Sequence, residues 1–192
     1  MRPPEGNRSI ASAVYGTGGD LYYCDATETR IYRIHEGHVE EAYRHNGYIR
    51  HLAVDSAGRL YFSVVGLMHD DGSIFRLDSG RAVPVLTVNA ADLGGSWSGT
   101  FALDRNDKVW LSSGAASPSG LYQVINGAPV QVYSATDHAI MGFAFLPDGS
   151  IAFADNARSV YQLTLPNQVA KLFESPYEGR LTDVQIGDRG SM

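Results

Sequence analysis

The sequence predicts an all-β protein, specifically a β-propeller of four four-stranded antiparallel blades with an extra C-terminal inner strand. Two short runs rich in β-branched and aromatic residues, LYYCD at 21–25 and RIYRI at 30–34, flank a turn-prone segment and predict a hairpin. The pair recurs three more times, and its first run begins at residues 21, 60, 109 and 151, spaced by 39, 49 and 42 residues. Such a period is typical of folds built from repeated supersecondary units.

Each hairpin extends to four strands. An inner strand and a tight turn containing Gly, Asn or Asp precede it, and a second turn and an outer strand follow it. Inner strands are expected at residues 10–15, 49–55, 100–104 and 140–146, second strands at 21–25, 60–64, 109–113 and 151–155, third strands at 30–34, 73–77, 120–124 and 159–163, and outer strands at 39–43, 82–88, 129–134 and 169–174. No helix is expected. A β-sandwich is the alternative fold, but a sandwich does not need near-identical quartets of strands.

The organisation that follows is one domain over residues 1–192. Its repeats cover about 10–44, 49–88, 97–135 and 140–175, and a closing strand is expected at 181–186. Because residues 10–15 already complete the first unit, the closing strand allows two assemblies. It can close a four-bladed ring beside the first hairpin, which we expect, or an open arc can form a homodimer through the terminal strands.

Composition excludes several partners and sites. A net charge of −6 and an isoelectric point near 5.4 do not favour nucleic acid or an anionic membrane as a partner. The absence of an 18-residue apolar stretch and of a signal-peptide core leads us to expect a cytoplasmic protein. A single cysteine, Cys24, allows neither an intrachain disulfide nor a Cys-rich zinc site.

Three segments resemble the blades of the SMP-30/gluconolactonase group, and also those of NHL repeats and streptogramin lyase. They are GRLYF at 58–62, DGSIFRL at 71–77 and LYYCDATETRIYRI at 21–34. The resemblance extends over nearly the whole chain through generic blade positions, although these relatives usually carry six or seven blades. It implies a metal-dependent lactonase with a divalent cation such as Ca²⁺, Mn²⁺ or Zn²⁺ at one mouth of the channel.

In the family this cation is held by Asn, Asp and Glu side chains at the heads of the inner strands. The matching positions here carry no carboxylate or amide: they are Ala11, Arg50, Gly99, Met141 and Thr182. Asp183 lies one position beyond Thr182. Because Ca²⁺ takes six to eight oxygen ligands, the family's cage is not reproduced. Any metal would have to use Asp183, Asp25 and Asp155.

Polar residues are expected to gather at one mouth of the propeller. In an up-and-down sheet, the connections from outer to next inner strand and from second to third strand lie on the same face. These connections and the strand ends beside them carry Arg50, His51, Trp97, Asp137, His138, Glu178 and Asp183, together with Asp25, His69, Asp70, Asp71, Asp155 and Asn156. This mouth is therefore the expected ligand-binding face.

The predicted catalytic residues are Arg50, His51 and Asp183. His51 stands where most other repeats carry a small residue, and a histidine near an aspartate can act as general base or acid at neutral pH. Arginine can fix a carboxylate or an oxyanion. In the structural alternative, His51 packs against neighbouring blades and Arg50 pairs with a surface acid.

The predicted ligand-binding residues are Trp97, His138, Asp25, Asp155 and His69. The two aspartates occupy equivalent ends of second strands and are either paired carboxylates across the channel or acceptors for backbone N–H groups of the following turn. The tryptophan is either a stacking platform or a filler between blades. The His-Asp-Asp run that begins at residue 69 does not have the spacing of a calcium loop and fits a solvated turn.

These observations indicate a propeller that binds a small molecule and acts as a hydrolase, lyase or cyclase without a tightly held metal. Two alternatives stay open. One is the metal-dependent lactonase implied by the resemblance, and the other is a non-catalytic scaffold that binds a protein or a sugar.

Overall fold

The repeated hairpins fold as predicted, and each becomes part of a four-stranded antiparallel sheet. The computed structural model describes residues 10–25, 29–66, 71–114, 118–177, 179–181 and 183–184. Blade 1 comprises β1 (Ile10–Tyr15), β2 (Leu21–Asp25), β3 (Arg30–His35) and β4 (His38–Arg44), and blade 2 comprises β5 (Tyr48–Val54), β6 (Leu60–Val65), β7 (Asp71–Asp78) and β8 (Arg81–Asn89). Blade 3 comprises β9 (Phe101–Leu103), β10 (Val109–Ser112), β11 (Ser119–Ile125) and β12 (Ala128–Ala135), and blade 4 comprises β13 (Phe143–Phe145), β14 (Ile151–Ala154), β15 (Ser159–Thr164) and β16 (Gln168–Glu174).

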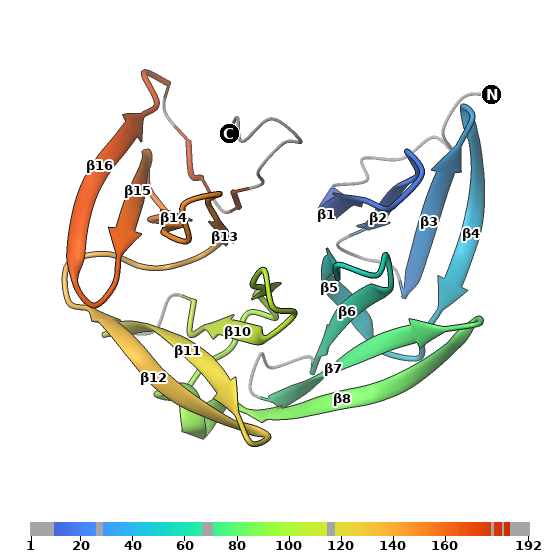
Figure 1. Ribbon diagram of the computed structural model, residues 1–192, viewed down its shortest axis with the longest axis horizontal. Helices are drawn as coiled ribbons and strands as arrows, with labels where there is room; N and C mark the ends of the chain where they lie inside the picture. The colour runs from blue at the N-terminus through green and yellow to red at the C-terminus, as the bar shows by residue number, and fades with distance from the viewer. Residues whose placement is uncertain are drawn as a thin grey trace.

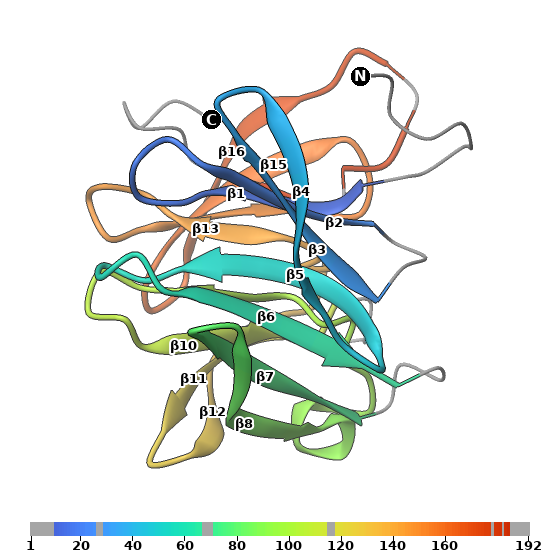
Figure 2. The ribbon, with the colours of Figure 1, turned by 90° about the vertical axis from the view of Figure 1, so that its right-hand side faces the viewer.

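The four blades are arranged around a common centre, which confirms the predicted propeller (Figure 1). The first strand of every blade is innermost and the last is outermost. Seen from the side, the sheets are twisted and successive blades overlap (Figure 2). Among the described residues, β1 packs on β5, β5 on β9 and β9 on β13, whereas no comparable packing joins β13 to β1. The described residues therefore form an arc, and the closed ring that we expected is not made by direct packing of these two strands.

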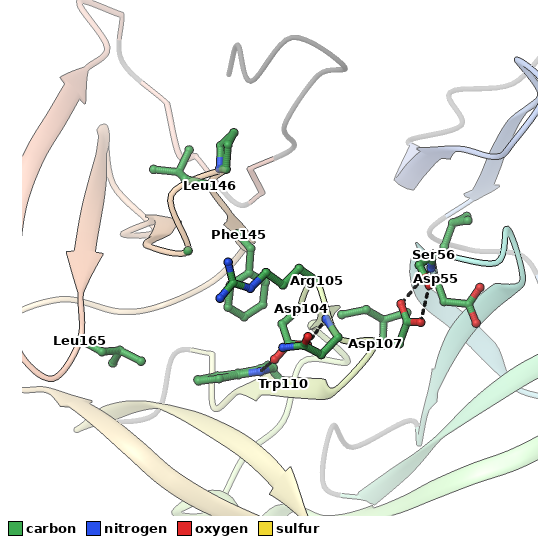
Figure 3. Close-up of a pocket in the computed structure, with 14 residues that line it drawn as sticks. Asp55, Ser56, Asp104, Arg105, Asp107, Trp110, Phe145, Leu146 and Leu165 are labelled. Atoms are coloured by element: carbon green, nitrogen blue, oxygen red, sulfur yellow. Dashed lines mark hydrogen bonds between the residues drawn. The ribbon is translucent and has the colours of Figure 1, made fainter.

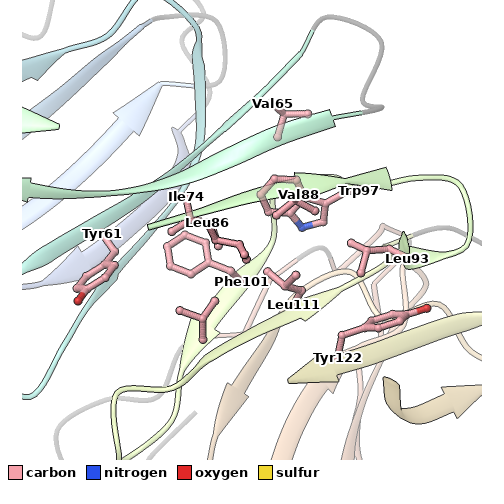
Figure 4. Close-up of a cluster of buried hydrophobic side chains, with 11 residues drawn as sticks. Tyr61, Val65, Ile74, Leu86, Val88, Leu93, Trp97, Phe101, Leu111 and Tyr122 are labelled. Carbon is pink, nitrogen blue, oxygen red and sulfur yellow. The ribbon is translucent and has the colours of Figure 1, made fainter. Parts of the chain in front are cut away.

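Three apolar cores fill the spaces between successive blades. The core between blades 2 and 3 is shown in Figure 4 and contains Tyr61, Val65, Ile74, Leu86, Val88, Leu93, Trp97, Phe101, Val109, Leu111 and Tyr122. The core between blades 1 and 2 contains Cys24, Ile31, Ile49, Leu52, Leu60 and Phe62, and the core between blades 3 and 4 includes Trp110, Leu121, Phe143, Ile151, Phe153 and Leu163. Burying each large side chain contributes about 1.5–3 kcal/mol, so these cores hold the arc together.

The tight turns between inner and second strands use the residue types that the sequence pattern suggested. Gly58 and Gly149 adopt left-handed conformations with φ of 80° and 86°. The equivalent position of blade 3 is Asp107, with φ of 59°. Aspartate tolerates this conformation better than most residues, and here it leaves a carboxylate on the turn.

Two segments differ from the predicted strands. Strand β13 begins at Phe143 rather than at residue 140, because Ile140 forms a bridge with Gly114 of blade 3 and donates its N–H to the Ser119 hydroxyl. A 3₁₀ turn, η1 (Ala90–Leu93), follows β8 where no helix was expected. It is capped by the Asn89 side chain, which accepts a hydrogen bond from the Ala91 N–H at 3.0 Å.

The predicted closing strand at 181–186 lies partly outside the described residues. Its described members, Leu181, Asp183 and Val184, do not belong to a strand. Leu181 donates its N–H to the Ala157 carbonyl at 2.8 Å, and Val184 is buried against blade 4. None of the described segments forms a helix with the length and hydrophobicity needed to cross a bilayer.

Candidate functional site

His51 is buried on the inner strand of blade 2. It is 7% exposed, and its ring lies edge-on to Phe101 with centroids 5.5 Å apart. Its backbone N–H donates to the Ser63 hydroxyl at 3.1 Å. Of the five histidines that the structure describes, it is the one classed as buried. The imidazole is therefore held in a fixed position in a medium of low polarity.

Asp183 supplies a negative charge to this histidine from the C-terminal segment. Burial lowers the pKa of His51, and the Asp183 carboxylate partly opposes that effect by favouring the protonated ring. One carboxylate oxygen of Asp183 accepts the Val184 N–H at 2.8 Å, which fixes the side chain against its own backbone. Asp183 therefore lies within electrostatic range of His51, a second predicted catalytic residue.

Arg50 is the extra residue of a β-bulge next to His51. Strand β5 pairs Ile49 with Val64 and His51 with Ser63, so Arg50 has no opposite residue in the ladder. Strand β1 has a bulge at the equivalent position, between Ile10 and Ser12. Bulges redirect side chains and occur often beside active sites. A Cβ on Gly99 would lie 2.8 Å from the Arg50 Cβ, so the glycine leaves space for the bulge.

Asp25 and Cys24 lie at the end of β2, close to the same group. The pKa of the Cys24 thiol is raised to about 12, chiefly by burial; a hydrogen bond with the Ser12 backbone lowers it, the Asp25 carboxylate raises it and the Arg50 guanidinium lowers it. Both charged residues are therefore within electrostatic range of Cys24. The buried thiol is not a nucleophile at neutral pH. Asp25, which is 3% exposed, adds a second carboxylate to this mouth.

Two of the predicted ligand-binding residues have structural roles here. Trp97 is fully buried in the core between blades 2 and 3, and its indole N–H donates to the Thr100 carbonyl at 3.1 Å. Its burial favours the alternative in which the ring fills space between blades. One carboxylate oxygen of Asp155 accepts the N–H groups of Ala157 and Ser159 at 2.9 and 3.1 Å, as expected for an aspartate that stabilises the following turn.

The remaining predictions are only partly described. His138 is half-buried and its ring stacks on Tyr161 with centroids 4.3 Å apart, which places it on blade 4. His69 lies outside the described residues, as do Asp70 and Glu178. Within the part of the chain that the structure describes, no three His, Cys, Asp or Glu side chains form a group that could hold a metal ion.

A cavity of about 620 Å³ at the opposite mouth was not predicted from the sequence (Figure 3). It is formed by the turns between inner and second strands, whereas the predicted site used the other connections. Its lining includes Asp55, Ser56, Asp104, Arg105, Asp107, Trp110, Phe145 and Leu165. The turn at 105–107 reads Arg-Asn-Asp and the equivalent turn at 56–58 reads Ser-Ala-Gly, but this difference alone does not predict a cavity.

Comparison with solved structures confirms the fold-level resemblance. A protein assigned as a gluconolactonase aligns with 91% of this chain and 66% of its own, at 14% identity and a TM-score of 0.69. Virginiamycin B lyase from Staphylococcus aureus aligns with 91% of this chain and 58% of its own, at 14% identity and a TM-score of 0.63. A chain of a nidogen/laminin complex aligns with 89% of this chain and 66% of its own, at 14% identity and a TM-score of 0.68.

These similarities show the fold alone, because all three identities are low. The chain spans less than two thirds of the length of each of these structures. No family model matches the chain, and no curated protein matches it either.

Proposed function

We propose that this propeller binds a small molecule at the mouth formed by Arg50, His51 and Asp183 and acts there as a hydrolase, lyase or cyclase. The observation that carries the proposal is the buried His51 imidazole with the Asp183 carboxylate acting on it. A buried histidine with an acidic neighbour is a common arrangement for proton transfer.

The lowered pKa of His51 sets its role. Because burial disfavours the imidazolium, the ring stays neutral at pH values where an exposed histidine would be partly protonated. A neutral imidazole accepts a proton from water or from a carbon acid of the substrate. Asp183 then stabilises the imidazolium that forms, and the histidine returns the proton to the leaving group. Burial and the carboxylate therefore have complementary effects in a general base.

Arg50 would bind the negative charge that develops during such a reaction. The bulge displaces Arg50 from the regular ladder beside His51. Its guanidinium carries a permanent charge and several N–H donors, which suits a substrate carboxylate or an oxyanion.

Two structural neighbours support this class of chemistry. One is a lyase, and a variant of it in which a histidine is replaced by alanine is catalytically inactive and was crystallised with quinupristin. The other is assigned as a gluconolactonase. Both have the propeller fold, so the fold accommodates lyase chemistry, and a histidine is required in the lyase.

The test is an activity screen of the native chain with aryl esters, simple lactones and quinupristin. His51→Gln and Asp183→Asn replace the proposed catalytic groups with side chains of similar size. We expect His51→Gln to lower kcat/KM at least about 100-fold, the lower end of the range typical of general bases, and Asp183→Asn to lower it less, by about 10-fold, because the aspartate acts through the histidine. His38→Gln is the matched control, because that histidine is exposed at the start of the outer strand β4 and was not predicted to bind a ligand. An unchanged rate in His51→Gln would refute the catalytic role.

The same screen distinguishes the proposed metal-independent reaction from the metal-dependent lactonase. The proposed mechanism needs no cation, so activity should survive EDTA and should not rise when Ca²⁺, Mn²⁺ or Zn²⁺ is added. Loss of activity in EDTA that these cations restore would favour the lactonase implied by the sequence resemblance. Saturable binding with no turnover of any substrate would favour the scaffold alternative.

A further inference from the structure

The cavity at the opposite mouth has two chemically different walls. The turns of blades 2 and 3 form a polar wall, and blades 3 and 4 form an apolar wall (Figure 3). Its volume of about 620 Å³ falls within the 300–1,000 Å³ typical of small-molecule sites. No residue proposed for catalysis lines it.

The carboxylates of the polar wall are already bonded to protein donors. Asp107 accepts the N–H and the hydroxyl of Ser56 at 2.8 and 2.6 Å. Asp104 accepts the Trp110 indole N–H at 3.1 Å and the N–H groups of Asn106 and Lys108 at 2.8 and 3.0 Å. Asp55 accepts the Arg59 side chain at 2.6 Å, together with two backbone N–H groups. These groups have fixed positions and much of their hydrogen-bonding capacity is used.

Arg105 is the positively charged residue in the lining of this cavity. Unlike the carboxylates, it has no hydrogen bond or ion pair within the part of the chain that the structure describes, and it is exposed. Figure 3 shows its side chain extending from the turn between β9 and β10 in the direction of Phe145. A guanidinium offers five N–H donors in a planar arrangement that matches a carboxylate. Arg105 therefore offers unused donor capacity to an anionic acceptor.

The apolar wall suits a flat ring. Trp110 and Phe145 meet edge to face, with centroids 5.3 Å apart and an interplanar angle of 71°. Leu146, Pro147 and Leu165 continue this wall, and Leu165 is 41% exposed. Because Trp110 donates its N–H to Asp104, its ring cannot easily rotate away. The aromatic surface is thus held at a fixed orientation.

We propose that this cavity binds an aromatic monocarboxylate, with the carboxylate on Arg105 and the ring on the wall formed by Trp110, Phe145 and Leu165. The site is separate from the one proposed for catalysis and does not depend on it. An organic amine is the competing ligand, because it could interact with the aspartates. The bonds that these aspartates accept from Ser56, Trp110 and Arg59 leave fewer acceptor positions for an ammonium group but do not remove the carboxylate charges, so an amine is the decisive competitor in the test.

Isothermal titration of the native chain with three indole probes tests the proposal. Indole-3-acetate carries the carboxylate, indole-3-acetamide is its neutral analogue and tryptamine carries an ammonium group. We expect saturable binding of indole-3-acetate, at least 10-fold tighter than that of the other two. Arg105→Gln should abolish this preference. Lys108→Gln removes a cation from the same turn that does not line the cavity, and it should leave the preference unchanged.

A second measurement locates the bound probe. The chain has two tryptophans, and Trp97 is fully buried in another core. Indole-3-acetate should therefore shift the NMR signal of the Trp110 indole N–H and leave that of Trp97 unchanged. His51→Gln should bind the probe as the native chain does, which separates this site from the catalytic proposal. Absence of saturable binding, equal or tighter binding of tryptamine, or unchanged binding in Arg105→Gln would overturn the proposal.

Discussion

At the scale of single residues, burial determines what the predicted site residues can do. His51 and Trp97 both come from positions that the sequence placed at the mouth, and both are buried. For the histidine, burial lowers the pKa and the Asp183 carboxylate partly opposes this, which is the basis of the proposed role as a general base. The tryptophan N–H is bonded to a backbone carbonyl, and its ring only fills space between blades. Burial is therefore compatible with a proposed proton-transfer role for His51, whereas for Trp97 it indicates packing.

The first prediction concerns the pH dependence of stability. Because the pKa of His51 is lower in the folded protein than the 6.5 of an exposed histidine, the unfolded chain binds a proton more readily than the folded one. Protonation therefore favours unfolding, and stability should fall as the pH drops below about 6.5. Urea unfolding at pH 7.5 and 5.5 should show a larger decrease for the native chain than for His51→Gln. Equal decreases would show that His51 titrates normally in the folded state.

The sequence was sufficient to identify His51 and Trp97 as candidate site residues, but not to predict which residues surround them. His51 interrupts the repeat at a position that the pattern identifies, so it could be singled out. Its neighbour Asp183 comes from a segment more than 130 residues later in the chain, and only the fold brings their charges together. Whether Trp97 faces solvent depends on the packing of Leu93 and Phe101 around it, which no local pattern specifies.

At the scale of secondary-structure elements, alternation and turn chemistry predict most of the strands. The runs at 10–15 and 21–25 match β1 and β2 to the residue. The prediction is less accurate where a strand end interacts outside its own blade. Ile140 continues the apolar run of β13, but it bonds to blade 3 and leaves the ladder of blade 4. Local periodicity cannot distinguish these two partners.

The second prediction compares two leucines that differ in burial, one on an inner part of a blade and one on an outer strand. Leu111 on β10 is fully buried between blades, whereas Leu172 on the outer strand β16 is 39% exposed. Leu111→Ala should therefore lower the free energy of unfolding by about 2–5 kcal/mol, and Leu172→Ala by less than about 1 kcal/mol. Urea unfolding of both variants gives the comparison. Similar losses would mean that the outer strand is buried in solution, for example by a second copy of the chain.

At the scale of the whole molecule, the two mouths of the arc have different character. The mouth with His51 combines a buried histidine, an arginine in a β-bulge and two carboxylates from distant segments. The mouth with the cavity is lined by tight turns whose aspartates are bonded to protein donors. The sequence predicted that polar residues would converge at one mouth. It did not indicate the cavity, because that volume depends on how three consecutive blades are spaced.

The third prediction concerns the contact that joins blades 2 and 3 at the cavity. Ser56 and Asp107 lie 51 residues apart, and two hydrogen bonds connect them. Because this contact is exposed to solvent, a double-mutant cycle of Ser56→Ala and Asp107→Asn should give a coupling energy of only about 0.5–1 kcal/mol in urea unfolding.

Asn106 provides the control, since it belongs to the same turn and lines the same cavity without a side-chain bond to Ser56. The effects of Ser56→Ala and Asn106→Ala on the free energy of unfolding should add.

If the contact between Ser56 and Asp107 also maintains the spacing of blades 2 and 3, Ser56→Ala will weaken the binding of indole-3-acetate even though Ser56 does not contact the carboxylate in the proposed complex. Full additivity in the first cycle would show that the apolar core between blades 2 and 3 alone sets that spacing.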